Sequence, residues 1–429
     1  MKLHVEEPKN LIPKLMDLIK ILQKVKNESR NLILVDDKKI NEILLQVASE
    51  IERDYPKILA ANFKDLRKID KNDPIFDRVL LNFDRIKSIA DSLRIIADYK
   101  SPVGLTIEEK NLKNGLKLRK VSVPFGVIGV IFEARPNVVV DVFALCFKSK
   151  NACVLKGGSQ SENSNFAFMG IIQKVLKKFF KNSNIAVLLP NDRAIVAQFL
   201  KSNKYVDVII PRGGKGLIDF VRNNSSIPVI ETGAGVVHTY VDESADIEMA
   251  KEVIFNAKTS RPSVCNALDT MIVHQKKLKD LNKICEKLAN KKVLIYTDES
   301  SYKALTNKYP KNLLFKAEKG HFGMEFLSLK MSIKTVKNLD EAIFHINTFG
   351  SGHSEAILTK NKANAEKFLN MVDAACVYVN ASTRFTDGGE FGLGAEIGIS
   401  TQKLHARGPM GIKELTSYKW EICGNGQVR

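Results

Sequence analysis

Cys265 is the residue of this chain whose surroundings best suit nucleophilic chemistry. It lies in the segment Lys258-Thr-Ser-Arg-Pro-Ser-Val-Cys-Asn-Ala-Leu-Asp-Thr270, which is short, polar and unfavourable for a helix. A thiol acts as a nucleophile when water reaches it and when nearby donors or positive charge stabilise its thiolate. The neighbours predicted to supply these conditions are Lys258, Arg261, Ser263 and Asn266. An ordinary buried cysteine is an equally good interpretation of the local sequence.

The chain has six cysteines. Cys146, Cys153, Cys285 and Cys376 lie in apolar or helical patterns and are predicted to be core residues. The cysteines show no paired spacing typical of zinc sites, and the first residues, Met1-Lys-Leu-His-Val-Glu-Glu, contain no apolar signal region. These features predict a cytoplasmic protein without disulfides or a metal site.

Two glycine-rich loops follow predicted strands. They read Lys156-Gly-Gly-Ser159 and Pro211-Arg-Gly-Gly-Lys-Gly216. Glycine lets backbone amides approach a phosphate closely, and the start of the next helix adds partial positive charge. Neither loop matches GxGxxG or the Walker pattern, so each taken alone is equally compatible with a tight turn.

These candidate groups must be positioned by two sets of alternating strands and helices. The first set of predicted strands is Gly126–Phe132, Ala152–Leu155, Ile185–Leu189, Val206–Ile210 and Pro228–Ile230. Helices are predicted between them at Val138–Lys148, Asn163–Phe180 and Arg193–Lys201. The second set of strands is Thr270–His274, Val293–Tyr296, Met331–Lys334, Glu355–Leu358 and Cys376–Val379. This alternation predicts two α/β domains with mostly parallel sheets and the thiol at their junction.

Two further regions flank this pattern. Residues 1 to about 100 are predicted to be helical, as in Ile40–Ile51 and Phe83–Leu93, where apolar residues recur at three- and four-residue spacing. Leu112–Val121 alternates apolar and polar residues around Asn114-Gly115, which predicts a β-hairpin. A two-stranded ribbon is not stable alone, so it should pack on another subunit or on the far end of the chain, such as Thr416–Ile422.

Composition limits the classes of function. The chain has 429 residues and is 44% hydrophobic, enough for a large core and two or three domains. Its net charge of +18 is spread along the sequence, which favours anionic small molecules over nucleic acid as partners. The longest apolar runs are interrupted by Arg135 or Asp141 and are too short to span a membrane.

Taken together, the thiol, the two loops and the strand order resemble the aldehyde dehydrogenase superfamily. The segments that carry the resemblance are Val123–Val138, Ser260–Ala267, His345–Ile357 and Glu390–Gly398. Within the superfamily the chain is similar to the branch that reduces an acyl phosphate of glutamate in proline biosynthesis. The resemblance implies an aldehyde dehydrogenase-like fold: a cofactor-binding domain at 1–100 and 124–233, a catalytic domain at 234–410, and a small β oligomerisation element at 101–123 and 411–429.

The resemblance also implies roles for individual residues. Cys265 would attack the acyl carbon and form a thioester, and the Asn137 amide would stabilise the oxyanion. Glu231 stands where hydrolytic members keep a base, but a reductase needs no activated water, so it is first a wall of the active site. The expected cofactor-binding residues are Lys156, Gly157, Gly158, Ser159, Arg212, Gly213, Gly214 and Glu325.

NADPH is the cofactor implied by the first of these loops. Lys156 would contact the adenine-side ribose and Glu325 the nicotinamide-side ribose. Ser159 stands where relatives place a glutamate that repels the 2′-phosphate of NADPH, although Glu162 is close enough in sequence to restore NADH use.

The implied substrate is L-glutamyl 5-phosphate. Arg135, Arg261 and Arg407 are candidates to bind it, because a guanidinium fork suits both carboxylate and phosphate, and structural ion pairs are the alternative. The product would be L-glutamate 5-semialdehyde. Glutamate 5-kinase, which makes acyl phosphates of this kind, is the expected functional partner, and a homo-oligomer is the expected assembly.

Two rival functions remain open. One is a hydrolytic aldehyde dehydrogenase of a small amino-acid semialdehyde that uses Glu231 as its base. The other is a basic binding protein with a vestigial fold, against which the retention of every matched site residue argues. His345 and His353 are predicted to be hydrogen-bonding loop residues, and Phe349 replaces a ring that the resemblance places there as His or Tyr.

Overall fold

The computed structural model describes residues 8–429. Residues 1–7 lie outside the described residues. They include the start of the chain, which was predicted to contain no signal region, and the beginning of the first predicted domain. The chain forms two compact units. Unit 1 contains the described residues up to Thr232 together with Gly392–Gly398 and Met410–Arg429, and unit 2 contains Gly233–Phe391 and Ile399–Pro409.

Unit 1 is built on a parallel sheet with the strand order β5-β4-β3-β6. Its strands are β3 (Val127–Phe132), β4 (Ala152–Lys156), β5 (Ala186–Leu188) and β6 (Val208–Arg212). They confirm four of the five strands predicted for this part of the chain. The fifth, at 228–230, is wrong as a strand, because only one bridge forms there, between Val229 and Ile209.

Helices pack around this sheet, and the first five confirm, for the described residues, the helical region predicted up to about residue 100. The helices are α1 (Pro8–Leu32), α2 (Asp37–Arg53), α3 (Tyr55–Leu66), α4 (Pro74–Val79), α5 (Phe83–Asp98), α6 (Val138–Lys148), α7 (Glu162–Phe179), α8 (Arg193–Phe199) and α9 (Lys215–Asn224). The start of α7 is fixed by Asp65 of α3, whose buried carboxylate accepts hydrogen bonds from the amides of Asn163 at 3.1 Å and Ser164 at 2.8 Å. Asp65 therefore caps the helix that follows the first glycine-rich loop.

Unit 2 is built on a seven-stranded parallel sheet with the order β10-β9-β11-β8-β7-β12-β13. Its strands are β7 (His238–Val241), β8 (Thr270–His274), β9 (Leu294–Thr297), β10 (Leu314–Lys316), β11 (Lys330–Val336), β12 (Ser354–Leu358) and β13 (Cys376–Val379). Five of them were predicted. Sequence analysis missed β7 and β10, although β7 lies inside the sheet between β8 and β12.

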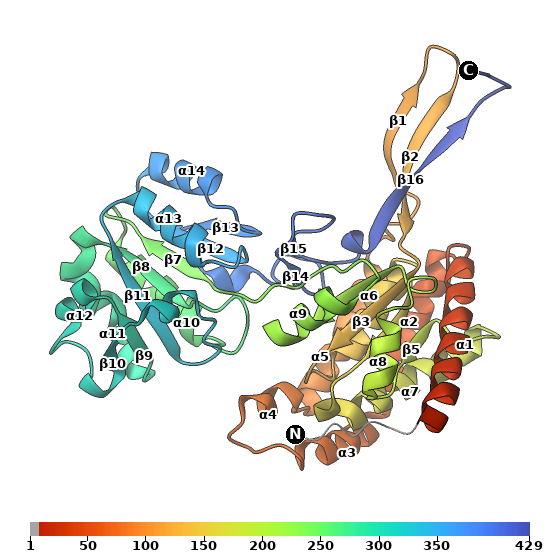
Figure 1. The fold of residues 1–429 in the computed structure, drawn as a ribbon, viewed down its shortest axis with the longest axis horizontal. Coiled ribbons are helices and arrows are strands. Elements are labelled where there is room, and N and C mark those ends of the chain that lie inside the picture. Colours follow the sequence, from red (N-terminus) through yellow and green to blue (C-terminus); the bar gives the residue numbers. More distant parts are fainter. Residues whose placement is uncertain (1–7) are drawn as a thin grey trace. The chain divides into compact units, whose positions relative to one another are not determined.

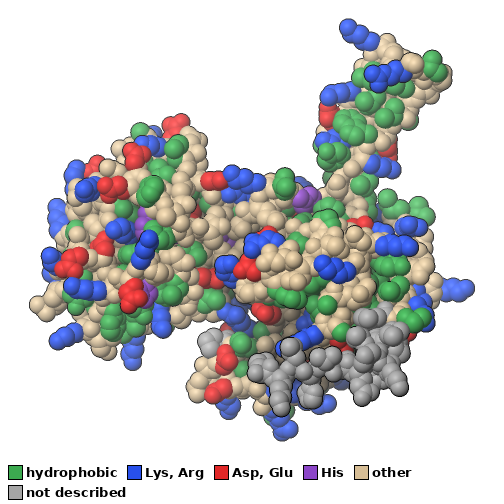
Figure 2. Space-filling model, viewed as in Figure 1, with side chains coloured by type: hydrophobic (Ala, Val, Ile, Leu, Met, Phe, Trp, Pro, Cys, Tyr) green, Lys and Arg blue, Asp and Glu red, His purple; other side chains and the backbone are tan. Residues whose placement is uncertain are grey.

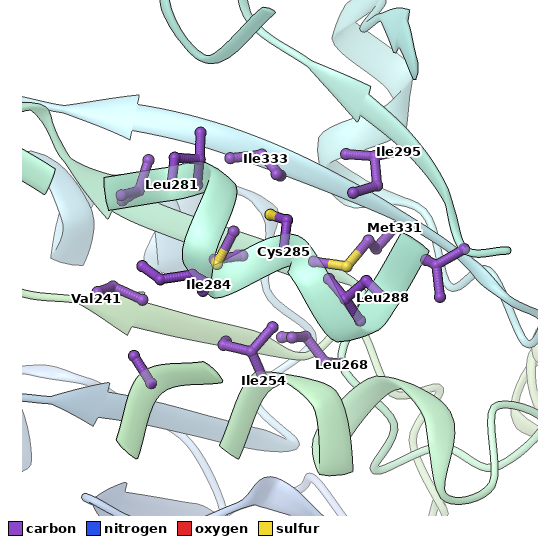
Figure 3. Close-up of a cluster of buried hydrophobic side chains, with 14 of the residues drawn as sticks. Val241, Ile254, Leu268, Leu281, Ile284, Cys285, Leu288, Ile295, Met331 and Ile333 are labelled. Atoms are coloured by element: carbon purple, nitrogen blue, oxygen red, sulfur yellow. The ribbon is translucent and has the colours of Figure 1, made fainter. Parts of the chain in front are cut away.

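The core of unit 2 lies between this sheet and its helices. The helices are α10 (Ile247–Thr259), α11 (Leu281–Asn290), α12 (Glu299–Leu305), α13 (Leu339–Phe349) and α14 (Lys362–Met371). Figure 3 shows Cys285 and Leu288 of α11 among Ile254 of α10 and Met331 and Ile333 of β11, all fully buried. Cys285 is thus a core residue, as predicted. A short pair, β14 (Ile399–Ser400) and β15 (Gly408–Pro409), completes the unit.

An arm of three antiparallel strands belongs to unit 1 (Figure 1). It consists of β1 (Thr106–Asn111), β2 (Lys117–Pro124) and β16 (Thr416–Cys423), with β2 in the middle. The predicted hairpin is confirmed, with Gly115 at a φ of 89° in its turn. The ribbon packs on the far end of the chain, since β16 pairs with β2 along its whole length and Arg119 contacts Glu421 at 2.6 Å.

Apolar side chains remain exposed along this arm, and Figure 2 shows them interspersed with basic side chains. They are Leu105, Ile107, Leu112, Tyr418, Trp420 and Ile422. If the chain assembles through the arm, as the sequence predicts, replacing Leu116 and Leu118 by lysine is expected to lower the mass of the assembly, because the charges would disrupt the apolar surface of the arm. Light scattering would measure the mass. An unchanged mass for a folded double variant would show that the arm does not serve assembly.

Within residues 8–429, no helix is long and apolar enough to cross a membrane.

Candidate active site

Cys265 lies in the turn that leads from α10 to β8, and its side chain is half-buried. Cys146, Cys153, Cys285 and Cys376 are buried, as predicted, and burial raises the pKa of Cys285 to about 12 and that of Cys146 well above its usual value. Such thiols stay protonated at neutral pH. Among the described cysteines, two are open to solvent: Cys265, which is half-buried, and Cys423, which is exposed on the arm.

Gly235 ties the Cys265 turn to Glu325. A Cβ atom added at Gly235 would lie 1.6 Å from the carbonyl oxygen of Cys265, so the two backbones approach as only glycine allows. The amide of the same glycine donates a hydrogen bond of 2.9 Å to Oε1 of Glu325. One backbone position in unit 2 therefore holds both the predicted nucleophile and a predicted cofactor ligand.

Lys258 is not free to act on the thiol, and this part of the prediction is wrong. Its side chain is fully buried at the end of α10, where Nζ donates to the carbonyl of Leu268 at 2.7 Å and lies 3.9 Å from Asp269. Burial lowers the pKa of Lys258 and raises that of Asp269, and the attraction between the two charges acts in the opposite direction on each. Asp269 also accepts the amide of Phe326 at 2.9 Å, so this pair supports the loop that carries Glu325.

Arg384 is the basic residue that the structure brings to the Cys265 turn, and sequence analysis missed it. Arg384 lies in a short 3₁₀ turn, Thr383–Phe385, and is 118 positions beyond Asn266 in the sequence. Its Nε donates to Oγ of Ser260 at 3.0 Å, and its Nη1 donates to Oδ1 of Asn266. The amide nitrogen of Asn266 is in turn bound to the carbonyl of Thr386 at 2.8 Å. The Asn266 side chain therefore positions Arg384 and the 383–385 turn. Its amide is used in these bonds and not in stabilising the Cys265 thiolate, the role predicted from the sequence.

Buried histidines lie elsewhere in unit 2. His345 is in α13, so its prediction as a loop residue is wrong, and burial lowers its pKa to about 3. His353 precedes β12, and its Nδ1 lies 2.8 Å from Oγ of Ser354 as a hydrogen-bonding loop residue, while burial lowers its pKa to about 4. Both are neutral at pH 7. Within the described part of the chain, no three His, Cys, Asp or Glu residues are grouped to hold a metal ion.

Asn137 lies at the start of α6, after a loop in which Ala134 has a positive φ of 38°. Its Nδ2 donates to Oδ2 of Asp141 at 2.7 Å, which orients the amide. Loss of hydration raises the pKa of Asp141 to about 6, although Asn137 and the charge of Arg212 act in the opposite direction. Arg135 is half-buried in the same loop.

The first glycine-rich loop lies at the carboxyl end of β4. A Cβ atom at Gly157 would lie 2.2 Å from Nδ2 of Asn165, so the loop packs tightly on α7. Gly157 and Gly158 line a shallow, open pocket together with Glu162, Asn165, Phe166, Leu188, Leu189 and Asn191. Burial lowers the pKa of Lys156, while the charges of Glu133 and Glu162 raise it. Ser159 is exposed at the start of the next turn.

The second loop lies at the carboxyl end of β6, which pairs with the opposite edge of β3 from β4. The amide of Gly214 donates to Oε2 of Glu133 at 3.0 Å, and a Cβ atom at Gly213 would lie 2.4 Å from the same oxygen. Arg212 lies 3.9 Å from Glu396. Glu133, which sequence analysis did not single out, therefore links β3 to this loop and acts electrostatically on Lys156 of the other.

The remaining predicted residues have different settings. Glu231 belongs to unit 1 and forms an ion pair with Arg222 at 3.4 Å. Arg407 forms an ion pair with Asp373 at 2.7 Å in unit 2, the structural alternative named for it above. Arg261 is exposed, and its charge acts on Arg384.

Comparisons with known proteins agree on one family. A model described as "Aldehyde dehydrogenase family" matches residues 17–300 and 331–420. A gamma-glutamyl phosphate reductase from Chlorobium phaeobacteroides is 55% identical over 412 residues, which cover 96% of this chain and 99% of the relative. One from Bacteroides thetaiotaomicron is 55% identical over 405 residues, covering 94% of this chain and 97% of the relative.

Solved structures give the same result. The crystal structure of gamma-glutamyl phosphate reductase from Thermotoga maritima matches with a TM-score of 0.90 and 41% identity, covering 96% of this chain and 99% of that one. A glyceraldehyde-3-phosphate dehydrogenase from Methanocaldococcus jannaschii, solved in complex with NADP, matches with a TM-score of 0.71 at 16% identity, covering 96% of this chain and 95% of that one. The second likeness concerns the fold alone, and the predicted aldehyde dehydrogenase-like α/β fold is confirmed.

Proposed function

The chain belongs to the aldehyde dehydrogenase family and, within it, to the gamma-glutamyl phosphate reductases of proline biosynthesis, and from this premise we propose that it reduces L-glutamyl 5-phosphate to L-glutamate 5-semialdehyde and phosphate with NADPH. The observation that carries the proposal is the 55% identity over 96% of the chain to a gamma-glutamyl phosphate reductase. The half-buried Cys265, in a turn held by Gly235, supports the same chemistry.

Cys265 is the nucleophile of the proposed reaction. Its thiolate attacks the acyl carbon, a C–S bond forms, and the C–O bond to phosphate breaks with its electron pair leaving on the phosphate. An acyl phosphate is activated, so this departure needs no protein acid. When bound, NADPH would provide the hydride needed to reduce the thioester to the aldehyde, and Cys265 would then leave as the thiolate.

Asn137 is the proposed oxyanion ligand. Its amide has two N–H groups, and the bond to Asp141 uses one of them and fixes the plane of the other. An amide whose orientation is already fixed can stabilise an oxyanion without reorienting as charge develops, which lowers the barrier. Glu231, held by Arg222, is proposed as a wall of the site, since thioester reduction needs no activated water.

The two glycine-rich loops fit a dinucleotide. Both lie at the carboxyl ends of parallel strands of one sheet, β4 and β6, which flank β3, and α/β sheets bind nucleotides at such ends. The pocket beside Gly157 and Gly158 has apolar side chains, Phe166, Leu188 and Leu189, among its lining residues. Lys156 and the loop Arg212–Gly214 would hold the anionic part of the cofactor, and Glu325, already oriented by Gly235, would accept ribose hydroxyls.

A coupled assay tests the proposal. Glutamate 5-kinase, the proposed functional partner, generates the labile acyl phosphate in place, and oxidation of NADPH is followed. In the reverse direction, oxidation of the semialdehyde is expected to require added phosphate. Full oxidation without phosphate would instead support the alternative, a hydrolytic aldehyde dehydrogenase with Glu231 as base.

The preference for NADPH over NADH is proposed to depend on Ser159. Glutamate there would repel the 2′-phosphate, so Ser159→Glu is expected to shift the ratio of kcat/KM values toward NADH by about tenfold. Glu162 lines the pocket, so one carboxylate is already near this loop. Removing its charge in Glu162→Gln should shift the preference in the opposite direction from Ser159→Glu, toward NADPH. Equal efficiency with both cofactors in the unmodified protein would contradict this proposal.

A further inference from the structure

The turn that carries Arg384 is joined to the Cys265 turn by several hydrogen bonds within unit 2. Besides the bonds of Arg384 to Ser260 and Asn266, Oγ1 of Thr383 donates to the carbonyl of Asn266 at 2.9 Å. Thr386 accepts the Asn266 amide through its carbonyl, and its hydroxyl accepts a bond of 2.7 Å from Ser354 of β12. The turn that carries Arg384 is therefore bound on both sides of Cys265, at Ser260 and Asn266, and to the sheet through Ser354.

Arg384 and Arg261 bring positive charge to the Cys265 turn, and the carboxylates of Asp387 and Glu390 partly offset it. The Arg384 guanidinium is half-buried, and burial lowers its pKa. Asp387, Cys265 and Glu390 raise that pKa, while the charge of Arg261 lowers it, so all four groups lie within electrostatic reach. A guanidinium is a fork-shaped donor that suits phosphate, and Arg384 is bonded to residues on both sides of Cys265, Ser260 and Asn266.

We propose that Arg384, together with Arg261, binds the phosphate of the acyl phosphate while the thiolate of Cys265 attacks its carbon. This inference rests on the proposed function and adds a specificity-determining residue to it. The C–S bond forms, the C–O bond breaks, and the phosphate keeps the electron pair. Its additional negative charge is stabilised by the two guanidinium groups, so Arg384 stabilises the leaving group.

Two measurements test this role in the intact protein. The first is the KM for inorganic phosphate in phosphate-dependent oxidation of the semialdehyde. The second needs no turnover: iodoacetamide alkylates Cys265 in the presence and absence of inorganic phosphate, and mass spectrometry separates that product from alkylated Cys423. Arg384→Ala and Arg384→Lys are compared with Lys367→Ala, which removes one positive charge from an exposed ion pair on α14.

For Arg384→Ala, the KM for phosphate is expected to rise about tenfold or more, while the KM for the semialdehyde changes little. Arg384→Lys keeps the charge and should recover part of the loss, and Lys367→Ala should resemble the unmodified protein. Phosphate should slow alkylation of Cys265 in the unmodified protein and in Lys367→Ala, and much less in Arg384→Ala.

The outcomes separate this inference from the proposed function. Loss of thermal stability with an unchanged KM for phosphate and unchanged protection of Cys265 would mean that Arg384 only holds the turn, and the inference would be overturned. If Arg384→Ala does not fold, Arg384→Lys decides by the same two readouts. If the unmodified protein shows no phosphate-dependent turnover, the proposed function fails, yet protection of Cys265 by phosphate that depends on Arg384 would still support the anion site.

Discussion

Replacing Cys265 by alanine is expected to lower the rate of acyl phosphate reduction by about 10³-fold or more, because no thioester can form. The fold and the affinity for NADPH should be nearly unchanged, since the half-buried side chain lies in a turn. The coupled assay measures the rate, and calorimetric titration measures cofactor binding. Substantial remaining activity in this variant would exclude the thioester mechanism.

Cys146→Ala and Cys153→Ala are the matched controls for that experiment. Both thiols are buried in unit 1, in α6 and β4. Their loss removes core contacts, so stability should fall on the order of 1 kcal/mol while the rate per folded molecule is retained. The contrast in thermal melting and rate separates a chemical role for Cys265 from a packing role.

Gly235→Ala is expected to have the second largest effect. Its new Cβ would lie 1.6 Å from the carbonyl oxygen of Cys265, which belongs to the backbone and cannot rotate away. The Cys265 turn and the loop bearing Gly235 must then separate. We expect a stability loss of about 3 kcal/mol, as for severe overpacking, and a fall in kcat of about 100-fold because the thiol and Glu325 move together.

Gly320→Ala provides the control within the same unit. A Cβ atom there meets nothing within 4 Å, so this variant should melt and turn over like the unmodified protein. Thermal unfolding and steady-state kinetics measure both variants. A Gly235→Ala protein with unaltered melting temperature and rate would mean that the close approach to Cys265 is dispensable.

The sequence was informative where a residue's role depends on its local neighbours. The strands that flank the glycine-rich loops have continuous apolar runs, and the Asn114-Gly115 turn defines its hairpin, so both could be predicted. The strand β7, His238–Val241, escaped detection because it contains His238 and Thr239. Both are buried, and the backbone amide and ring Nδ1 of His238 bond to Glu355 of β12, a partner that only the fold reveals.

The candidate site was harder to predict where its parts come from distant segments. Lys258 is near Cys265 in sequence, yet the face of α10 on which it lies turns it toward Leu268 and Asp269. Arg384 is far from Cys265 in sequence, and the pairing of β12 with its neighbours brings its turn to the thiol. Charge near a cysteine in the sequence is therefore a poor guide to charge near its sulfur.

The late arrival of β16 has a consequence for synthesis of the protein. Arg119 of β2 and its partner Glu421 are 302 positions apart, whereas unit 2 lies entirely between them. At about 5 to 20 residues per second, the ribosome needs roughly 15 to 60 s to make the intervening chain. During that time one edge of β2 has no strand to pair with, and unpaired edges promote aggregation. A nascent chain that stalls before β16 would therefore expose the unpaired, aggregation-prone edge of β2, although all of unit 2 has been synthesised and can fold.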